Sequence, residues 1–223
     1  MRPLDVRRLG VLRYSDALDL QRELVEECRA NRIPDLLLLL QHPAVITLGV
    51  KGDGGRANIL VSDDHLRDLG IEVAETGRGG DVTYHGPGQV VGYPILDLRP
   101  DRCDVHRYVR DLEEVMVRAC ADYGVPAGVL AGLTGTWVGD RKIGAIGVRI
   151  SRWITSHGFA FNANTSLDDF SLIVPCGIAN RGVTSLQRLI GRPLAIDRVE
   201  EALVRHFCDV FDRQLTTAAP ARA

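Results

Sequence analysis

The sequence Arg78-Gly79-Gly80-Asp81-Val82-Thr83-Tyr84-His85-Gly86-Pro87-Gly88-Gln89 runs directly into the apolar segment 90–98. Glycine loses more backbone freedom on folding than any other residue, so a dense cluster of glycines marks backbone that bends sharply or lies close to another group. A surface turn needs some of these glycines but not the polar side chains that stand between them. The stretch therefore predicts one wall of a substrate site.

The overall composition is that of an ordinary globular protein. The chain has 223 residues, of which 45% are hydrophobic and 25% charged, and it is long enough to bury a sizeable core. Its 27 basic and 29 acidic residues leave a net charge of -2. This balance gives no bulk electrostatic reason for binding nucleic acid or an anionic membrane, and we expect neither partner.

Further features indicate the compartment. The longest apolar run, 36–40, is strand-sized and far shorter than the ~20 residues that span a bilayer. The N-terminus lacks the apolar core of a signal peptide. The five cysteines are irregularly spaced without a C-x-x-C pair, which is typical of reduced thiols and not of disulfides or a zinc site. We therefore expect a cytoplasmic protein without a bound metal.

Apolar periodicity predicts a mixture of helices and strands. Helices are expected at 15–31, capped by Ser15 or Asp16, at 104–123, capped by Asp104, at 197–215, and as a short helix at 167–172. Strands are expected at 6–9, 36–40, 45–48, 71–74, 90–98, 136–138, 142–150 and 154–161. Segment 36–40 is apolar without alternation, which indicates a strand covered on both faces. Pro94 cannot donate to a strand ladder, so it predicts an edge position or a bulge.

The order of these elements indicates the fold class. Hairpins and helices are mixed and do not alternate strictly, which favours one α+β domain over a doubly wound parallel sheet. No linker divides the chain, so residues 1–215 are predicted to form a single domain. Residues 216–223 lack large apolar side chains and are predicted to be a disordered tail.

The cysteines differ in their settings. Cys28, Cys120 and Cys208 fall within predicted helices, where a free cysteine acts as a small hydrophobe, and Cys103 precedes a helix without a supporting motif. Cys176 lies between Pro175 and Gly177, on a stiff and uncrowded turn that suits a nucleophile. From these residues alone, a nucleophile and an ordinary buried loop cysteine both remain open.

A nucleophilic thiol needs a neighbouring base or positive charge. Lys142 and Lys51 are the two lysines of the chain, and Lys142 opens a run of small and apolar residues where desolvation would depress its pKa and leave a neutral amine. A surface lysine at a turn explains the same pattern. His85 and His157, which lie near glycines, are the alternative bases.

Several motifs together resemble one family. The pattern Arg78-Gly79-Gly80-x-x-Thr83-Tyr84-His85-x-x-Gly88-Gln89-x-Val91-x-Tyr93 resembles the signature of the lipoyl(octanoyl) transferases, which move octanoyl from acyl carrier protein to a lysine of lipoyl domains. The likeness spans about residues 4–211. It continues in His42-Pro43-x-Val45-x-Thr47-Leu48-Gly49, Lys142-Ile143-Gly144-Ala145-Ile146-Gly147-Val148-Arg149, His157-Gly158-Phe159-Ala160-Phe161-Asn162 and Val174-Pro175-Cys176-Gly177-Ile178.

The resemblance implies a fold and a set of site residues. The fold is that of the biotin and lipoate protein ligases, a mixed β-sheet with packed helices. Cys176 would accept the acyl group, and Lys142 would lower the pKa of its thiol and act as acid and base. The substrate-binding residues would be Arg78, Gly79, Gly80, Asp81, Val82, Thr83, Tyr84, His85, Ala145, Ile146, Gly147, Gly158, Phe159 and Ala160.

The resemblance also implies the partners. Octanoyl-acyl carrier protein would be the donor, and lipoyl domains of 2-oxoacid dehydrogenases and the glycine cleavage H protein the acceptors. No cofactor is expected, since the thioester arrives activated. Small residues, namely Gly144, Ala145, Gly147 and Gly158, would leave room for the acyl chain. The partners in this family are typically small acidic domains, so Arg149 and Arg152 are candidates for a basic patch that contacts them.

Two other functions fit parts of the pattern. An ATP-dependent lipoate or biotin ligase shares the fold, but it uses a longer glycine-rich phosphate-facing motif in place of 83–89 and needs no nucleophilic cysteine. A non-catalytic acyl or lipoyl-domain binder leaves the combination of Cys176, Lys142 and His85 unexplained.

Overall fold

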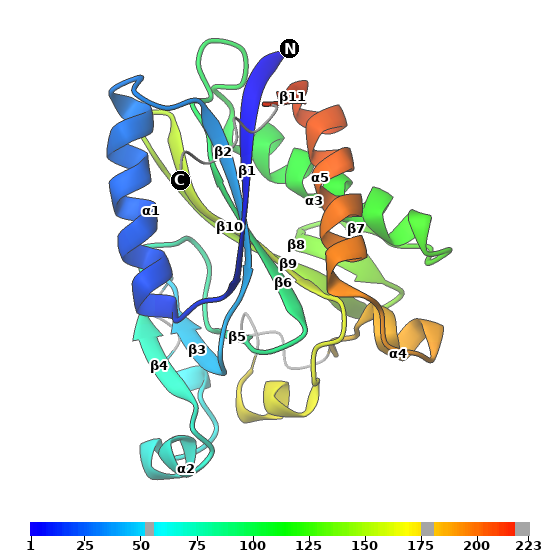
Figure 1. Ribbon diagram of the computed structural model, residues 1–223. Coiled ribbons are helices and arrows are strands. Elements are labelled where there is room, and N and C mark those ends of the chain that lie inside the picture. Colours follow the sequence, from blue (N-terminus) through cyan, green and yellow to red (C-terminus); the bar gives the residue numbers. More distant parts are fainter. Residues whose placement is uncertain (52–55, 175–180, 217–223) are drawn as a thin grey trace, which may run out of the picture.

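The structure is a computed structural model that describes residues 1–51, 56–174 and 181–216. Its main sheet has eight strands in the order β11-β1-β2-β6-β10-β9-β8-β7, and a second sheet has the order β4-β3-β5 (Figure 1). The strands of the main sheet are β1 (Arg2–Val11), β2 (Asp35–Gln41), β6 (Gln89–Ile95), β7 (Gly128–Leu130), β8 (Leu133–Val138), β9 (Arg141–Ser151), β10 (Ile154–Asn162) and β11 (Arg213–Leu215). Those of the second sheet are β3 (Val45–Leu48), β4 (Glu72–Glu75) and β5 (Thr83–His85).

The main sheet is mixed and carries helices on both faces. β11, β1 and β2 are parallel neighbours, and the ladders from β2 onward to β7 are antiparallel. The helices are α1 (Tyr14–Arg29), α2 (Asp63–Asp68), α3 (Val105–Asp122), α4 (Leu186–Ile190) and α5 (Ile196–Phe211), with 3₁₀ turns at Arg56–Asn58 and Asp168–Leu172. This arrangement confirms the predicted α+β class with a mixed sheet.

β2 shows why the sheet is covered on both sides. Its leucines are completely buried, and they alternate between two cores. Leu36, Leu38 and Leu40 pack in the core that α1 covers, whereas Leu37 and Leu39 pack in the core of α3 and α5 (Figure 1). An apolar run without alternation is what a strand between two helical layers requires, so this prediction is confirmed.

The glycine-rich stretch contains a strand that the sequence did not indicate. Residues Thr83–His85 form β5, which pairs antiparallel with β3 through Thr47–Thr83, Ile46–Tyr84 and Val45–His85. Three residues are too few to show a period-2 pattern. The pairing fixes one end of the stretch beside β3, and this small sheet lies at one end of the main sheet (Figure 1).

Pro94 occupies a central strand, so the predicted edge position is wrong. β6 lies between β2 and β10, and Pro94 pairs with Leu37 of β2. On the β10 side the ladder stops at Gly92–Phe159 and resumes at the isolated bridge Asp97–Ile154. Proline is tolerated because it falls in this gap, where its missing N–H interrupts no ladder bond.

The C-terminal helix is shorter than predicted. α5 ends at Phe211, because Asp212 takes a left-handed conformation with φ 52°, and Arg213–Leu215 form β11 against β1. Thr216 belongs to the predicted disordered tail, yet its N–H donates to the carbonyl of Leu4 at 2.9 Å. The remainder of that tail lies outside the described residues.

The predicted caps have different outcomes. Asp104 caps α3 as predicted, because its side chain accepts from the N–H of Arg107. The N-cap of α1 is Arg13, which lies two residues before Ser15 and three before Asp16 and makes no side-chain cap bond, so both predicted caps are wrong.

Candidate active site

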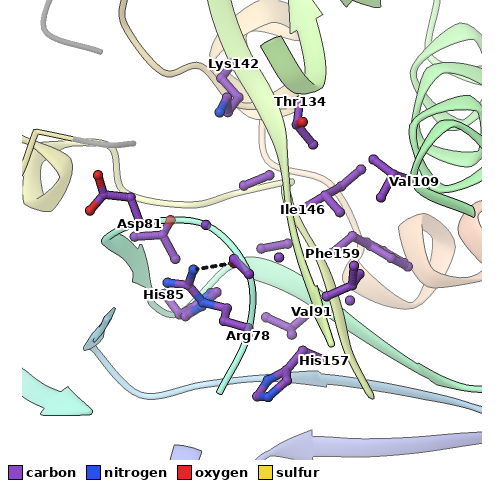
Figure 2. A pocket seen from close by; sticks show the side chains of 18 of the residues that line it. Arg78, Asp81, His85, Val91, Val109, Thr134, Lys142, Ile146, His157 and Phe159 are labelled. Atoms are coloured by element: carbon purple, nitrogen blue, oxygen red, sulfur yellow. Dashed lines mark hydrogen bonds between the residues drawn. The ribbon is translucent and has the colours of Figure 1, made fainter. Parts of the chain in front are cut away.

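A cavity of about 420 Å³ lies between the glycine-rich stretch and the neighbouring strands β9 and β10. In Figure 2, Lys142 and Thr134 lie at one end and His157 at the other, with Ile146, Phe159 and Val91 between them. Both strands contribute because they are adjacent and antiparallel, with Phe159 paired to Ile146 and Ala160 to Ala145. The middle of this slot is apolar on the side of Ile146, Phe159 and Val91, whereas Arg78, Asp81 and His85 line the side of the glycine-rich stretch.

Most of the predicted site residues line this cavity. Those on its wall are Arg78, Gly79, Gly80, Asp81, Thr83, His85, Lys142, Ala145, Ile146, Gly147, Gly158, Phe159 and Ala160. Val82 and Tyr84 do not line it and pack instead in a separate core with Phe170. Side chains alternate along β5, so Thr83 and His85 face the cavity while their neighbours face away. Cys176 lies outside the described residues.

Lys142 stands at the start of β9, beside the chain that follows the undescribed segment 175–180. Its N–H donates to the carbonyl of Gly182 and its carbonyl accepts from Thr184, both at 2.9 Å, which gives a parallel bridge to Val183. Its ammonium lies 4.8 Å from the ring centroid of Trp137. The lysine is therefore a fixed part of the cavity wall and not a surface turn residue.

Arg78 brings a buried positive charge to the cavity. The side chain is 7% exposed, and its guanidinium donates to the carbonyl and the hydroxyl of Thr47, at 2.8 Å each, and to the carbonyl of Gly79. A Cβ on Gly147 would lie 2.8 Å from the Arg78 side chain, and one on Gly49 would lie 2.2 Å from the Gly80 carbonyl oxygen. Glycine at both positions lets these chains pack against each other.

His85 is held as a neutral imidazole. Its Nδ1 lies 2.7 Å from Oε1 of Gln89, whose Nε2 donates to Asn162 Oδ1 at 2.9 Å. Asn162 in turn donates to the carbonyl of Thr184 at 3.0 Å. Burial, followed by the neighbouring His42, lowers the pKa of His85 to about 3. A polar chain thus connects His85 to the residue that bonds to Lys142, and its imidazole is a weak base at neutral pH.

His157 is also neutral, at the other end of the slot. Burial, followed by the positive charge of Arg78, lowers its pKa to about 4. It pairs with Val148, six residues along β9 from Lys142, a separation of about 20 Å at the rise of a β-strand. The candidate bases Lys142 and His157 are therefore not neighbours.

Three glycines do not provide the room that the sequence suggested. A Cβ on Gly144 would lie 2.5 Å from the sulfur of Met116, and one on Gly158 would lie 2.2 Å from the carbonyl oxygen of Gly92. The space beside Gly147 is taken by Arg78, as described above. These glycines serve close packing of protein on protein, so the prediction that their missing side chains leave space for a substrate is wrong.

Several residues of the wall were not predicted as site residues. Tyr14 of α1, Val109 of α3 and residues 132–134 line the cavity from parts of the chain without a site motif. Val109 has the spacing of a core residue, and nothing in the sequence distinguishes it. His42 lies behind the wall, completely buried, between the carbonyl of Leu12 and the hydroxyl of Tyr93. His42 belongs to one of the sequence motifs, but only the fold assigns it this position.

The other cysteines match their predicted settings. Cys28 and Cys120 are buried, and burial raises their pKa values to about 11 and about 12. Burial also raises the pKa of Cys208. Cys103 is exposed. The thiols of Cys28, Cys120 and Cys208 are therefore poor nucleophiles at neutral pH.

The described ranges contain neither a metal-binding cluster nor a membrane-spanning helix. Residues 1–51, 56–174 and 181–216 contain no cluster of three or more histidine, cysteine, aspartate or glutamate side chains that could hold a metal. None of the helices in these ranges is long and apolar enough to cross a membrane.

The chain has clear relatives in sequence. Residues 13–208 match the family model of the lipoyl protein ligase A/B catalytic domain. An octanoyltransferase of Myxococcus xanthus is 51% identical over 226 residues, which cover 99% of this chain and 63% of that protein. An octanoyltransferase of Solibacter usitatus is 49% identical over 223 residues, which cover 100% of both chains.

Solved structures share the fold at low sequence identity. A bi-partite lipoate protein ligase of Thermoplasma acidophilum has a TM-score of 0.74 at 18% identity, with 98% of this chain and 87% of that chain covered. A lipoate-protein ligase A bound with ATP has a TM-score of 0.73 at 18% identity, with 97% and 87% covered. At this identity the likeness concerns the fold alone.

Proposed function

This chain belongs to the lipoyl protein ligase A/B catalytic domain family, and we propose that it takes octanoyl from an acyl carrier protein, holds it as a thioester on Cys176 and passes it to a lysine of a lipoyl domain. Octanoyl transfer is the activity named for its relatives at about half identity, and the chain is accordingly an acyltransferase. The donor, the intermediate and the roles of individual residues are the parts that we propose.

The position of Lys142 carries this proposal. Its backbone bonds to Gly182 and Thr184, six and eight residues after Cys176 in sequence. On the other side of the undescribed segment, the N–H of Val174 donates to the carbonyl of Asn58, whose side chain holds Asp81 on the cavity wall. The segments on both sides of Cys176 in sequence are thus bonded to residues of the cavity wall. These bonds support our proposal that the Cys176 thiol acts at the end of the slot where Lys142 lies.

The proposed reaction has two acyl transfers. The thiolate of Cys176 attacks the thioester carbonyl, a new C–S bond forms, and the bond to the carrier sulfur breaks, so that the carrier leaves as a thiol with a proton from the ammonium of Lys142, which becomes a neutral amine. The lysine amine of the lipoyl domain then attacks the same carbonyl, an amide forms, and the Cys176 sulfur leaves. Lys142 stabilises the thiolate and takes the proton of the attacking amine. No nucleotide is consumed, because the acyl group arrives activated.

Lys142 suits this role better than the histidines. His85 and His157 have pKa values lowered to about 3 and about 4, so neither imidazole would hold a proton taken from a thiol at neutral pH. His157 also lies about 20 Å along the strand from Lys142. The polar chain from His85 to Thr184 instead supports a role in orienting the segment beside Lys142.

The middle of the slot suits an aliphatic chain. Val91, Ile146 and Phe159 line it, with Ala145 and Ala160 paired between β9 and β10. Burial of an eight-carbon chain would contribute about 5 kcal/mol, at about 0.8 kcal/mol for each methylene. A binding free energy of this size is compatible with turnover, and a small contribution from each methylene gives a graded preference for chain length.

Lipoyl domains are the acceptors that this family membership implies. We propose those of the 2-oxoacid dehydrogenases and the glycine cleavage H protein in particular. A catalytic thiolate needs a reducing compartment, which supports a cytoplasmic location.

The proposal is tested by intact-mass spectrometry after incubation with octanoyl-acyl carrier protein. We expect a mass increase of one octanoyl group, lost in Cys176→Ala and retained in Cys103→Ser, the matched control at the exposed cysteine. Full transfer to a lipoyl domain by Cys176→Ala would overturn the thioester intermediate. Activity with free octanoate only when ATP is present would instead support a ligase.

Lys142 needs a separate test, in which alkylation of Cys176 is followed against pH in a Cys103→Ser background. We expect Lys142→Met to raise the pH at which the thiol reacts, while His85→Gln leaves it unchanged. A shift in the histidine variant alone would assign the base to His85.

A further inference from the structure

His157 lines two cavities. One is the slot of about 420 Å³, and the other is a second cavity of about 280 Å³ lined by α1 and the outer parts of β9 and β10. His157 lines both cavities, and the residue is 4% exposed. In Figure 2 it lies at the end of the slot opposite Lys142. The second cavity is lined by Leu18, Gln21, Arg22, Val25, Glu26, Arg29, Glu75, Gly77, Arg149, Ser151, Ile154 and Ser156.

The position of His157 is fixed by several contacts. Its backbone N–H donates to Oε1 of Gln21 at 2.7 Å, and its ring stands perpendicular to that of Tyr93 with centroids 6.3 Å apart. Its φ of 54° is left-handed, which a side chain with a Cβ adopts only at a cost. The next residue, Gly158, is pressed against the carbonyl of Gly92. These contacts fix His157 in one position, so it forms a rigid partition, by which we mean the wall that the two cavities share.

The partition is polar on the side of the second cavity. Within the described residues, Nδ1 of His157 and Nε2 of Gln21 are buried without a hydrogen-bond partner. Arg22 and Arg149 also line this cavity, and their charges add to the burial that keeps the imidazole neutral. On the slot side, Val91 and Phe159 lie between His157 and Lys142, and the charge of Arg78 there also keeps the imidazole neutral. An acyl chain in the slot would therefore meet an uncharged ring at its far end.

We infer that His157 is a specificity-determining residue that closes the far end of the slot and sets the longest acyl chain that the enzyme accepts. This inference rests on the proposed function, because it takes the slot to hold the acyl chain from Cys176 toward His157. Without the imidazole, the slot and the second cavity would join. A longer chain would then extend past the position of the ring toward Ile154 and Val25 on the wall of the second cavity.

The left-handed backbone decides which variants test this inference. His157→Gly removes the ring and relieves the backbone, because glycine adopts positive φ freely, and the N–H bond to Gln21 is kept. His157→Asn is a second variant with a smaller side chain that also tolerates this conformation. Trp153→Gly is the matched control. It replaces another residue of positive φ, at 67°, near the start of the same strand, and Trp153 lines neither cavity.

The experiment compares acylation rates with acyl carrier proteins that carry eight to fourteen carbons, measured by intact mass. We expect the ratio of the dodecanoyl to the octanoyl rate to rise at least tenfold in His157→Gly, because each methylene that finds an apolar surface contributes about fourfold. A smaller rise is expected in His157→Asn, and none in Trp153→Gly. An unchanged ratio in both His157 variants would overturn the inference.

The octanoyl measurement separates this inference from the proposed function. Acylation of Cys176 by octanoyl in the variants shows that they are folded and that the thioester forms, whatever the chain-length profile. If no octanoyl adduct forms on the unaltered enzyme either, the proposed function fails. If the adduct forms and the profile does not move, only the role of His157 fails.

Discussion

Asn58 donates through Nδ2 to both carboxylate oxygens of Asp81, at 3.1 and 3.0 Å. The carbonyl of Asn58 also accepts from the N–H of Val174 at 2.8 Å. One residue therefore connects the glycine-rich wall of the cavity to the chain that leads into Cys176. Asn58 itself lies in no motif, and both connections join segments far apart in sequence.

Replacement of Asn58 by alanine should slow acylation of Cys176 about tenfold or more. A hydrogen bond to a charged group contributes about 1.5–3 kcal/mol, and here its loss would release Asp81 from its position at the cavity. Burst kinetics with octanoyl-acyl carrier protein measure the effect. Asn164→Ala is the control, because Asn164 makes two side-chain bonds with Leu194 instead. An unchanged burst in Asn58→Ala would show that the connection has no role in catalysis.

Gly158 and Gly147 should respond differently to alanine. A Cβ on Gly158 would meet backbone at 2.2 Å, so Gly158→Ala should destabilise the fold by about 1–3 kcal/mol or more. A Cβ on Gly147 would meet the Arg78 side chain, so Gly147→Ala should displace the guanidinium and reduce acylation with a smaller loss of stability.

Urea unfolding and burst kinetics separate these two effects. Gly128→Ala is the control, because no atom lies within 4 Å of the Cβ that it would add. Equal loss of stability and equal loss of acylation in the Gly147 and Gly158 variants would contradict the assignment of different contacts to the two glycines.

The buried histidines should make stability depend on pH. His85 and His157 have folded-state pKa values of about 3 and about 4, below the ordinary value of 6.5, so the unfolded chain binds protons that the folded chain does not. The contribution of these two imidazoles to stability is then constant above about pH 6.5, and it falls as the pH drops from 6.5 toward 4. Each imidazole contributes a slope of up to about 1.4 kcal/mol per pH unit.

Replacement of these imidazoles should flatten that slope. We expect His85→Gln to narrow the difference in free energy of unfolding between pH 7.5 and pH 5.0, measured in urea. His65→Gln changes an exposed imidazole on α2 and serves as the control. A wild-type free energy of unfolding that does not change over this pH range would show that the two histidines are accessible to protons in the folded state.

The last strand should depend on one buried ion pair. Arg213 Nε lies 2.9 Å from Asp35, and both side chains are almost fully buried. Removal of one partner leaves a buried charge, so Arg213→Ala should cost about 3–5 kcal/mol, whereas Arg198→Ala, which breaks an exposed pair with Glu201, should cost less than about 1 kcal/mol. Thermal unfolding measures both. Similar losses of stability in the Arg213 and Arg198 variants would mean that the ion pair does not hold β11 in the sheet.

Local patterns were sufficient for part of the fold. The unbroken apolar run of β2 indicated a strand covered on both sides, and helical periodicity located α3 together with its cap at Asp104. The edge position predicted from Pro94 is wrong, because proline is excluded from a central strand only where the ladder needs an N–H at that position. The predicted end of α5 is too late, because the strand at Arg213 depends on β1 and on the contact of Arg213 with Asp35, 178 residues away.

The sequence by itself determined the family of this protein and the activity that its relatives share. The glycine-rich stretch, Lys142 and the motif of Cys176 are local in sequence, and together they indicated the family that the relatives confirm. Only the tertiary structure decided what each residue of the stretch does. Alternation along β5 turns Thr83 and His85 to the cavity and Tyr84 away from it, and packing gives the space beside Gly147 to Arg78. The sequence gives the type of each residue directly. The direction of a side chain and the neighbour that fills its space depend on segments that come into contact only when the chain folds.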